Sequence, residues 1–212
     1  MYFRGPDGSD YTTTVLHCSF DGQELKYRAH GDELTLKGGR GLYEPSLTRF
    51  QDRYFLTLRH DTAAYVTTST DGLHFAPVRK WTFDDDQDLG SYNTQQHWLA
   101  HSDGLFLSYT RRGANNDHIP RNRAPIFLAQ VDAEKLHVIR QTEKPLIPER
   151  GAMLGNFGAA PITASQSWVT DAEYMHGGRP SPRGANGSIF AARVLWSQPN
   201  RLVGQANRGD SR

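Results

Sequence analysis

The chain has 212 residues, of which 37% are hydrophobic and 22% are charged, and this is enough for one domain with its own core. The formal net charge of +1 provides no overall field for nucleic acid or for a membrane surface, so neither is expected as a partner. The single cysteine, Cys18, excludes an intramolecular disulfide and a zinc site built on cysteines.

Short runs of alternating apolar and polar residues follow one another along the chain, and each is bounded by Gly, Pro, Asn or Asp. This pattern is typical of strands. It predicts strands at 53–60, 63–69, 96–102, 104–111, 124–131, 167–174 and 188–196. The segment 132–144 has some helical spacing, but it begins at a turn and contains β-branched residues, so we expect a turn and an outer strand there.

The runs recur as a strand-turn-strand unit at 14–25, 64–75, 126–138 and 189–196. Ser19 to Ser69 is 50 positions, Tyr65 to Phe127 is 62 and Phe127 to Phe190 is 63. A period of this length in a strand-rich chain indicates propeller blades with long loops.

The fold class that we expect is therefore all-β: a β-propeller of four-stranded antiparallel blades, with about four or five blades present. Such a chain is either a small ring or part of a larger propeller. We assign residues 1–196 to the propeller. The polar stretch 197–212 lacks strand periodicity and is expected to be a disordered tail.

One turn has a recognisable composition, "STDGLHF" at 69–75. We expect Ser69 and Asp71 to bond backbone groups, Gly72 to adopt a positive φ, and Phe75 to pack beneath the turn. "SFDGQEL" at 19–25 is a degenerate copy. Both are interpreted as structural, with no catalytic role for either aspartate.

The strongest candidate site combines "SYNTQQHW" at 91–98 with "NNDHIPRNRAP" at 115–125. His97 and His118 are 21 positions apart, the length of one hairpin out and back, so they are expected at one mouth of the fold. Two converging imidazoles can share a metal or divide acid and base roles near neutral pH. Arg121 and Arg123 can neutralise a carboxylate. The amides predicted to bind sugar hydroxyls are those of Asn93, Gln95, Gln96 and Asn116.

Further candidates come from strand ends and one loop. Glu44 precedes Pro45 at a strand start, where it either faces the central channel or lies in an edge turn. Arg59 can bind a carboxylate bidentately, or it can form a rim salt bridge with Asp61. Asn156 is expected to line the channel from the loop 148–158. Asp171 and Glu173 are interpreted as a polar strand end, with one of them able to pair with an arginine.

On these residues the chain resembles the sialidase-like (BNR/Asp-box) β-propeller superfamily of carbohydrate-active proteins. "YNTQQHW", "RRGANNDHIPRNRAPIFLAQVD" and "PERGAMLGNFG" are similar to bacterial propellers labelled exo-α-sialidase, which resemble the ulvan lyase and rhamnosyl-glucuronidase families. The similarity covers about residues 40–175. It implies proton transfer by His97 and His118, with Arg123 neutralising the carboxylate of the sugar.

The resemblance implies an enzyme that cleaves a glycosidic bond beside an acidic sugar, within an acidic oligosaccharide or polysaccharide. Three alternatives stay open: His-assisted β-elimination on uronic acids, glycan binding without catalysis, and a scaffold for protein interaction. No cofactor is predicted, although a divalent metal stays open, as does the oligomeric state. The start "MYFRGPDGSD" lacks a signal peptide and suggests a cytoplasmic protein, whereas the relatives are longer and secreted, which suggests a partial chain and a secreted or periplasmic protein.

Overall fold

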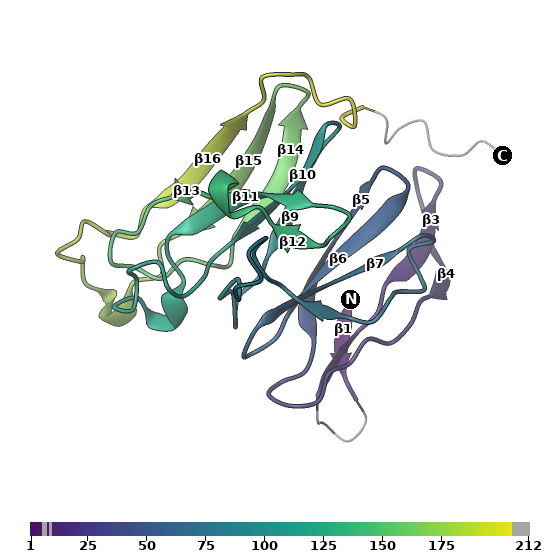
Figure 1. The fold of residues 1–212 in the computed structure, drawn as a ribbon, viewed down its shortest axis with the longest axis horizontal. Coiled ribbons are helices and arrows are strands. Elements are labelled where there is room, and N and C mark those ends of the chain that lie inside the picture. Colours follow the sequence, from purple (N-terminus) through teal and green to yellow (C-terminus); the bar gives the residue numbers. More distant parts are fainter. Residues whose placement is uncertain (6–7, 9, 205–212) are drawn as a thin grey trace.

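The structure, a computed structural model, describes residues 1–5, 8 and 10–204. Strands make up nearly all of its regular structure, and they form five antiparallel sheets (Figure 1). The helical segments are three-residue 3₁₀ turns at Pro120–Asn122, Arg140–Thr142 and His176–Gly178. Within the described ranges, no helix has the length and apolarity needed to cross a bilayer.

Two sheets have the meander expected of a propeller blade, in which four strands lie in chain order. The first contains β5 (Tyr43–Phe50), β6 (Arg53–Arg59), β7 (Ala64–Ser69) and β8 (Arg79–Lys80). The second contains β9 (His97–His101), β10 (Gly104–Tyr109), β11 (Ile126–Asp132) and β12 (His137–Val138), with β13 (Lys144–Ile147) also paired to β11. The predicted turn and outer strand in 132–144 are thus confirmed.

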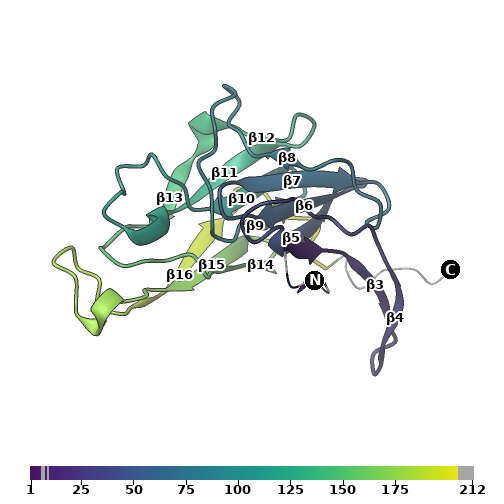
Figure 2. The same ribbon diagram turned by 90° about the horizontal axis from the view of Figure 1, so that it is seen from below.

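The remaining sheets are smaller. A three-stranded sheet contains β14 (Gly158–Thr163), β15 (Gln166–Ala172) and β16 (Ile189–Leu195). Two-stranded sheets pair β1 (Tyr2–Arg4) with β2 (Tyr11–Thr13), and β3 (Leu16–Phe20) with β4 (Leu25–His30). The β3–β4 ribbon extends away from the other sheets (Figure 2). The predicted all-β fold of antiparallel blades is therefore confirmed as a partial propeller, in which two of the five sheets have the full four-strand order.

The core lies between neighbouring blades, because alternate side chains of each strand face opposite blades. Along β9, Trp98 packs into the cluster shared with the β5–β8 sheet, which includes Phe55 and Trp81. Its neighbour Leu99 packs into the other cluster, shared with the β14–β16 sheet. This alternation is the one that the sequence predicts. It packs β9 against the β5–β8 sheet on one face and against the β14–β16 sheet on the other.

The turn after β7 has the predicted hydrogen bonds. The Asp71 Oδ1 atom accepts from the backbone N–H groups of Leu73 and His74, each at 2.8 Å, and from the Ser69 hydroxyl. Gly72 adopts a φ of 79°. The structural interpretation of this turn is thus confirmed, since its polar groups are used within the turn itself.

The chain after β16 runs back to the second blade. The Asn200 side chain is buried, donates to the Ala100 carbonyl and accepts from the Ser102 N–H. The first eight residues of the predicted tail, 197–204, therefore lie along the β9–β10 turn. Residues 205–212 lie outside the described part of the chain.

The burial pattern predicts a large difference between two leucines. Leu107 is fully buried in the inter-blade cluster, whereas Leu195 on β16 is 69% exposed. We expect Leu107→Ala to lower the free energy of unfolding by about 2–5 kcal/mol, because it leaves a cavity. The matched change Leu195→Ala should alter it by about 0.5 kcal/mol or less. Urea unfolding of both variants measures this, and equal losses would contradict the packing described.

Candidate functional site

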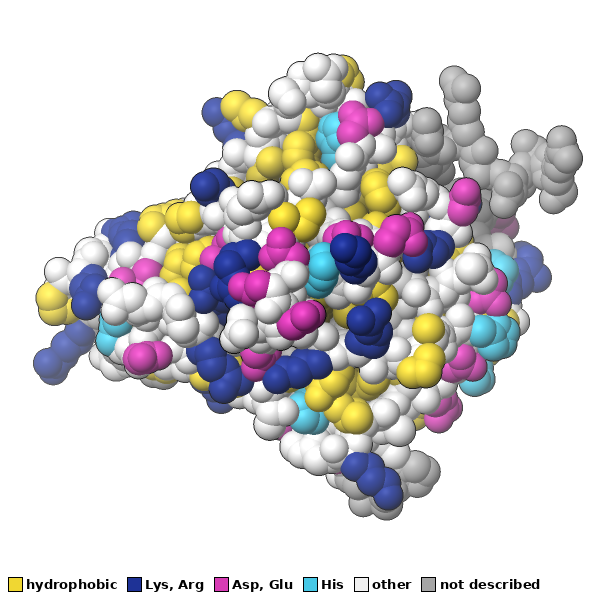
Figure 3. All heavy atoms as spheres, in the orientation of Figure 1, with side chains coloured by type: hydrophobic (Ala, Val, Ile, Leu, Met, Phe, Trp, Pro, Cys, Tyr) yellow, Lys and Arg dark blue, Asp and Glu magenta, His cyan; other side chains and the backbone are white. Residues whose placement is uncertain are grey.

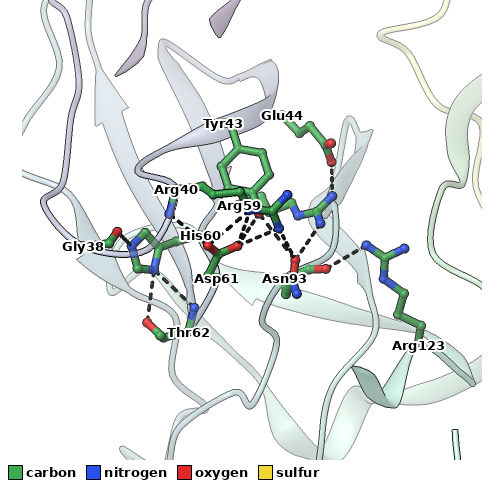
Figure 4. A network of polar contacts seen from close by, with 10 residues as sticks. All are labelled: Gly38, Arg40, Tyr43, Glu44, Arg59, His60, Asp61, Thr62, Asn93 and Arg123. Atoms are coloured by element: carbon green, nitrogen blue, oxygen red, sulfur yellow. Dashed lines mark hydrogen bonds and ion pairs between the residues drawn. The ribbon is translucent and has the colours of Figure 1, made fainter. Parts of the chain in front are cut away.

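Several sequence-predicted residues meet where the inner strands of the blades begin. The inner strands β5 and β9 lie side by side, and β14 lies beside β9. Their first residues are Tyr43, His97 and Gly158. Figure 4 shows Glu44, Arg59, Asn93 and Arg123 converging in one polar network near these strand ends. We call this network the mouth cluster, and it also contains Arg40, Tyr43 and Asp61.

Asn93 lies at the centre of the mouth cluster. Its Oδ1 atom accepts from the guanidinium groups of Arg40 and Arg59, each at 2.7 Å. Its backbone carbonyl accepts from Arg123 at 2.8 Å. Asn93 adopts a φ of 49°, a left-handed conformation that asparagine tolerates better than most residues. One residue of the loop before β9 thus joins three arginines that come from separate segments.

Arg40 and Tyr43 are held by Asp61. The Asp61 carboxylate accepts from the Arg40 side chain at 2.7 Å and from the Tyr43 hydroxyl at 2.6 Å. The hydrogen bonds from Arg40 lower the pKa of Asp61 to about 2, and burial raises the pKa of Tyr43 to about 12. At neutral pH the carboxylate is therefore charged and the phenol is protonated.

Glu44 on β5 pairs with Arg59 on β6, and not with Arg40. Its carboxylate forms an ion pair with the Arg59 guanidinium at 2.5 Å. The rim salt bridge between Arg59 and Asp61, considered from the sequence, is therefore not formed, because Asp61 is paired with Arg40 instead. The sequence leaves two positions open for Glu44, an edge turn or one facing the channel. The ion pair with Arg59 places the Glu44 carboxylate in the mouth cluster.

Arg123 is a buried cation. Its residue is 4% exposed, and its Nε atom is buried without a hydrogen-bond partner. Among the residues that the structure describes, it forms no ion pair with an acid. Burial, with the nearby charges of Arg59 and Arg121, lowers the pKa of Arg123 to about 10. The guanidinium stays charged at neutral pH and is left with unfilled donor capacity.

His97, the first residue of β9, contacts Gln95 and Phe157. Its Nε2 atom is 3.2 Å from the Gln95 Oε1 atom, and its ring meets the Phe157 ring edge-on at 4.9 Å between centroids. Burial lowers the pKa of His97, while the negative charge of Glu44 acts in the opposite direction. The imidazole is therefore neutral near pH 7 and able to accept a proton.

His118 has a different set of partners. Its Nε2 atom lies 3.2 Å from the Glu149 carboxylate, which Arg183 also approaches at 3.4 Å. In the described part of the chain, the two histidines that the sequence pairs thus share no hydrogen-bond or ion-pair partner. The charge of Glu44 acts on His97, whereas His118 lies in the loop between β10 and β11 and pairs with Glu149, which follows β13.

Two predicted sugar-binding amides are occupied by the protein itself, and this corrects the prediction. Gln96 is 1% exposed, accepts from the Thr57 hydroxyl, and donates to Ser91 and to the Thr94 carbonyl. Asn116 is also 1% exposed, and its amide nitrogen donates to three backbone carbonyls. Both side chains hold loops in place, because a loop buried in this way must satisfy its backbone groups internally.

Three other predicted residues are less buried than Gln96 and Asn116. Arg121 is exposed, and its charge acts on Arg123. Gln95 is half-buried against His97. Asn156 is exposed directly before Phe157. The polar groups of these three side chains are more accessible than those of Gln96 and Asn116.

Sequence reasoning missed the roles of Arg40, Tyr43, Asp61 and Asp171. Asp171 is 7% exposed, accepts from the Gly155 N–H at 2.7 Å, and has its pKa raised by burial. A Cβ at Gly155 would lie within 3.2 Å of the Arg123 side chain, so Asp171 holds a glycine turn against that arginine. The positive φ of Gly155, 106°, is the kind of constraint that a sequence signals only as a glycine.

The excess of positive charge at the site is local. On the face shown in Figure 3, basic and acidic side chains are interspersed, and the formal net charge of the chain is only +1. No group of three or more His, Cys, Asp or Glu residues in the described ranges is arranged to hold a metal ion. The arrangement is therefore suited to an anionic group that guanidinium donors can surround.

Comparison with known proteins identifies the fold. No family model and no curated protein matches the chain. A xylan β-1,4-xylosidase from Bacillus halodurans matches with a TM-score of 0.54 and 14% identity, over 90% of this chain and 38% of that one. A bifunctional GH43-CE protein of Bacteroides eggerthii matches with 0.53 and 14%, over 89% of this chain and 25% of that one. The chain therefore has the fold of part of these structures, a partial β-propeller.

A third structure extends this likeness to another group of enzymes. The GH32 β-fructofuranosidase of Bombyx mori matches with a TM-score of 0.52 and 10% identity, over 91% of this chain and 42% of that one. The chain thus spans less than half the length of each of these three structures. Their likeness does not single out the sialidase-like families that the sequence resembles.

The central position of Asn93 predicts an order of stability. Asn93→Gly removes the amide but keeps a residue that adopts a positive φ without strain, whereas Asn93→Ala adds strain. We expect the glycine variant to lose about 1–3 kcal/mol of unfolding free energy, because the buried Arg59 guanidinium and the exposed Arg40 guanidinium lose an acceptor. The alanine variant should lose about 1 kcal/mol more. A glycine variant as stable as the parent in urea unfolding would show that the amide contributes nothing.

The low pKa of Asp61 predicts a dependence of stability on pH. Because the folded-state value of about 2 lies below the ordinary 3.8, the contribution of Asp61 is fully present above pH 3.8 and is lost as pH falls through 2. We expect the parent to be more stable than Asp61→Asn at neutral pH, with the difference narrowing in this acidic window. Denaturant unfolding at several pH values measures it, and a difference independent of pH would contradict the ion pair.

Proposed function

We propose that this chain is part of a carbohydrate-active propeller that hydrolyses a glycosidic bond beside an acidic sugar. The observation that carries the proposal is the buried Arg123 guanidinium, which faces the mouth cluster with no acid partner among the described residues. A buried cation without a directly paired acid is costly, and a ligand carboxylate would offset that cost.

The geometry of the donors supports a carboxylate as the ligand group. Arg59 and Arg123 both donate to Asn93, one to its side chain and the other to its backbone, so their guanidinium groups are held near one another. Guanidinium groups bind carboxylates bidentately, and each ring of a uronic or sialic acid carries one carboxylate. The resemblance of the sequence to sialidase-like propellers supports the same class of sugar.

His97 is the group that we assign to proton transfer. In hydrolysis, the attacking water loses a proton as it bonds the anomeric carbon, and the bond from that carbon to the glycosidic oxygen breaks as solvent water gives the leaving oxygen a proton. A neutral imidazole accepts such a proton at neutral pH, and the lowered pKa of His97 keeps its ring neutral there. Gln95 bonds the ring at 3.2 Å and thereby orients it.

A second candidate function is glycan binding without cleavage. The observation that favours it is the pairing of His118 with Glu149, which occupies one of the two imidazoles. With one imidazole at the cluster, the arginines can still bind an acidic sugar while the second proton transfer has no assigned group. Both functions predict that the chain binds acidic glycans, but only the first predicts that it cleaves them.

The test compares binding and turnover on glycans that contain uronic or sialic acid. We expect reducing ends to appear with the parent chain, and Arg123→Gln to lower kcat/KM by roughly 100-fold, because a buried charged donor is lost. His97→Ala should retain binding and lose turnover. Arg193→Gln, on the exposed side of β16, is the matched control and should leave kcat/KM unchanged.

The outcomes separate the alternatives. A product that absorbs in the ultraviolet would mean elimination and not hydrolysis. Binding without any product would favour the glycan-binding function. If the parent neither binds nor cleaves any acidic glycan of the panel, while neutral glycans bind, the role given to Arg123 is wrong.

A further inference from the structure

Glu44 has an unusual backbone for its residue type. It adopts a φ of 47°, in the left-handed region that side chains other than those of Gly, Asn and Asp seldom occupy. It lies in a bulge, since the register between β5 and β6 shifts between Tyr43 and Ser46. Bulges redirect a side chain, and strain of this kind is retained where the surrounding structure requires it.

The bulge directs the Glu44 carboxylate toward the positive charge of the mouth cluster. The carboxylate pairs with Arg59 at 2.5 Å, and Figure 4 shows it on the side of Arg59 away from Asp61. Its charge also acts on Arg123 and on His97. Glu44 is thus an internal anion that pairs with Arg59 and acts on Arg123, the two groups that we assign to the carboxylate of a ligand.

Arg59 and Arg123 nevertheless retain donor capacity. The Nε atoms of both side chains are buried without a hydrogen-bond partner. Arg59 uses one terminal nitrogen for Glu44 and the other for Asn93, whereas Arg123 uses one for the Asn93 carbonyl. A single glutamate therefore leaves the arginine pair only partly satisfied.

We propose that Glu44 is a built-in competitor for the carboxylate of the ligand at Arg59 and Arg123. The inference rests on the proposed function, which supplies an acidic sugar as the ligand. When the sugar carboxylate binds both guanidinium groups, Glu44 leaves Arg59, because two carboxylates on the same donors repel each other. No covalent bond forms or breaks in this exchange.

The exchange gives the site a preference for anionic sugars. A neutral sugar cannot replace the charge of Glu44, so displacing Glu44 would leave Arg59 buried and unpaired. An acidic sugar replaces one ion pair with another and also satisfies Arg123. The cost is a lower apparent affinity, since part of the binding energy displaces the internal carboxylate.

The test is calorimetric titration of the full chain with D-glucuronate, and with D-glucose as the neutral probe. Glu44→Gln keeps the shape of the side chain and removes its charge, so we expect it to bind glucuronate about tenfold more tightly than the parent. D-glucose should remain weak in both. The matched control is Glu134→Gln, which removes another glutamate paired with an arginine, Arg53, at an exposed position. It should leave both affinities unchanged.

Weaker or unchanged glucuronate binding by Glu44→Gln would overturn the competition, and glucuronate binding by the parent would still support the proposed function. Failure of every variant to bind glucuronate would count against both. If Glu44→Gln does not fold, Glu44→Asp decides, because its shorter side chain draws back from Arg59 and should also tighten binding. Weaker or unchanged binding by Glu44→Asp would then overturn the competition.

Discussion

Trp81 and Trp98 pack against one another between the first two complete blades, with ring centroids 5.7 Å apart. Each indole N–H is bonded to the blade of β5 and β6: Trp81 donates to the Thr57 hydroxyl and Trp98 to the Ser46 carbonyl. Thr57 in turn donates to Gln96. Since buried polar groups must be paired, this contact fixes the loop before β9 against the neighbouring blade.

The position of that loop determines the mouth cluster. Asn93 lies three residues before Gln96, and its backbone N–H donates to the His60 carbonyl at 2.8 Å. The loop is therefore bonded to the first blade at Asn93 and at Gln96. Its amide can then accept from Arg40 and Arg59 while its carbonyl accepts from Arg123. Packing between blades thus sets the distances between charges that come from separate parts of the chain.

Strain and unpaired charge coincide at this place. Glu44 and Asn93 have positive φ values, as do Arg121 and Asn122 in the loop that carries Arg123. The Nε atoms of Arg59 and Arg123 are buried without partners. Strained backbone and unsatisfied buried donors each reduce stability, and both are features that proteins retain at binding sites. This coincidence connects the fold to the proposed carboxylate ligand, and it is independent of the two-histidine pattern in the sequence.

The sequence by itself determined the strands, their alternation and the turns, because these depend on neighbouring residues. The strands at 53–60, 96–102 and 167–174, and the turn at Asp71, follow from local periodicity and turn chemistry. It also singled out Glu44, Arg59, Asn93 and Arg123 by type. Only the tertiary structure decided the pairings: Arg59 with Glu44, Asp61 with Arg40, His118 with Glu149, and Gln96 with Thr57. Each partner comes from a different strand or loop, and the distance between such groups is set by blade packing, which sequence spacing does not measure.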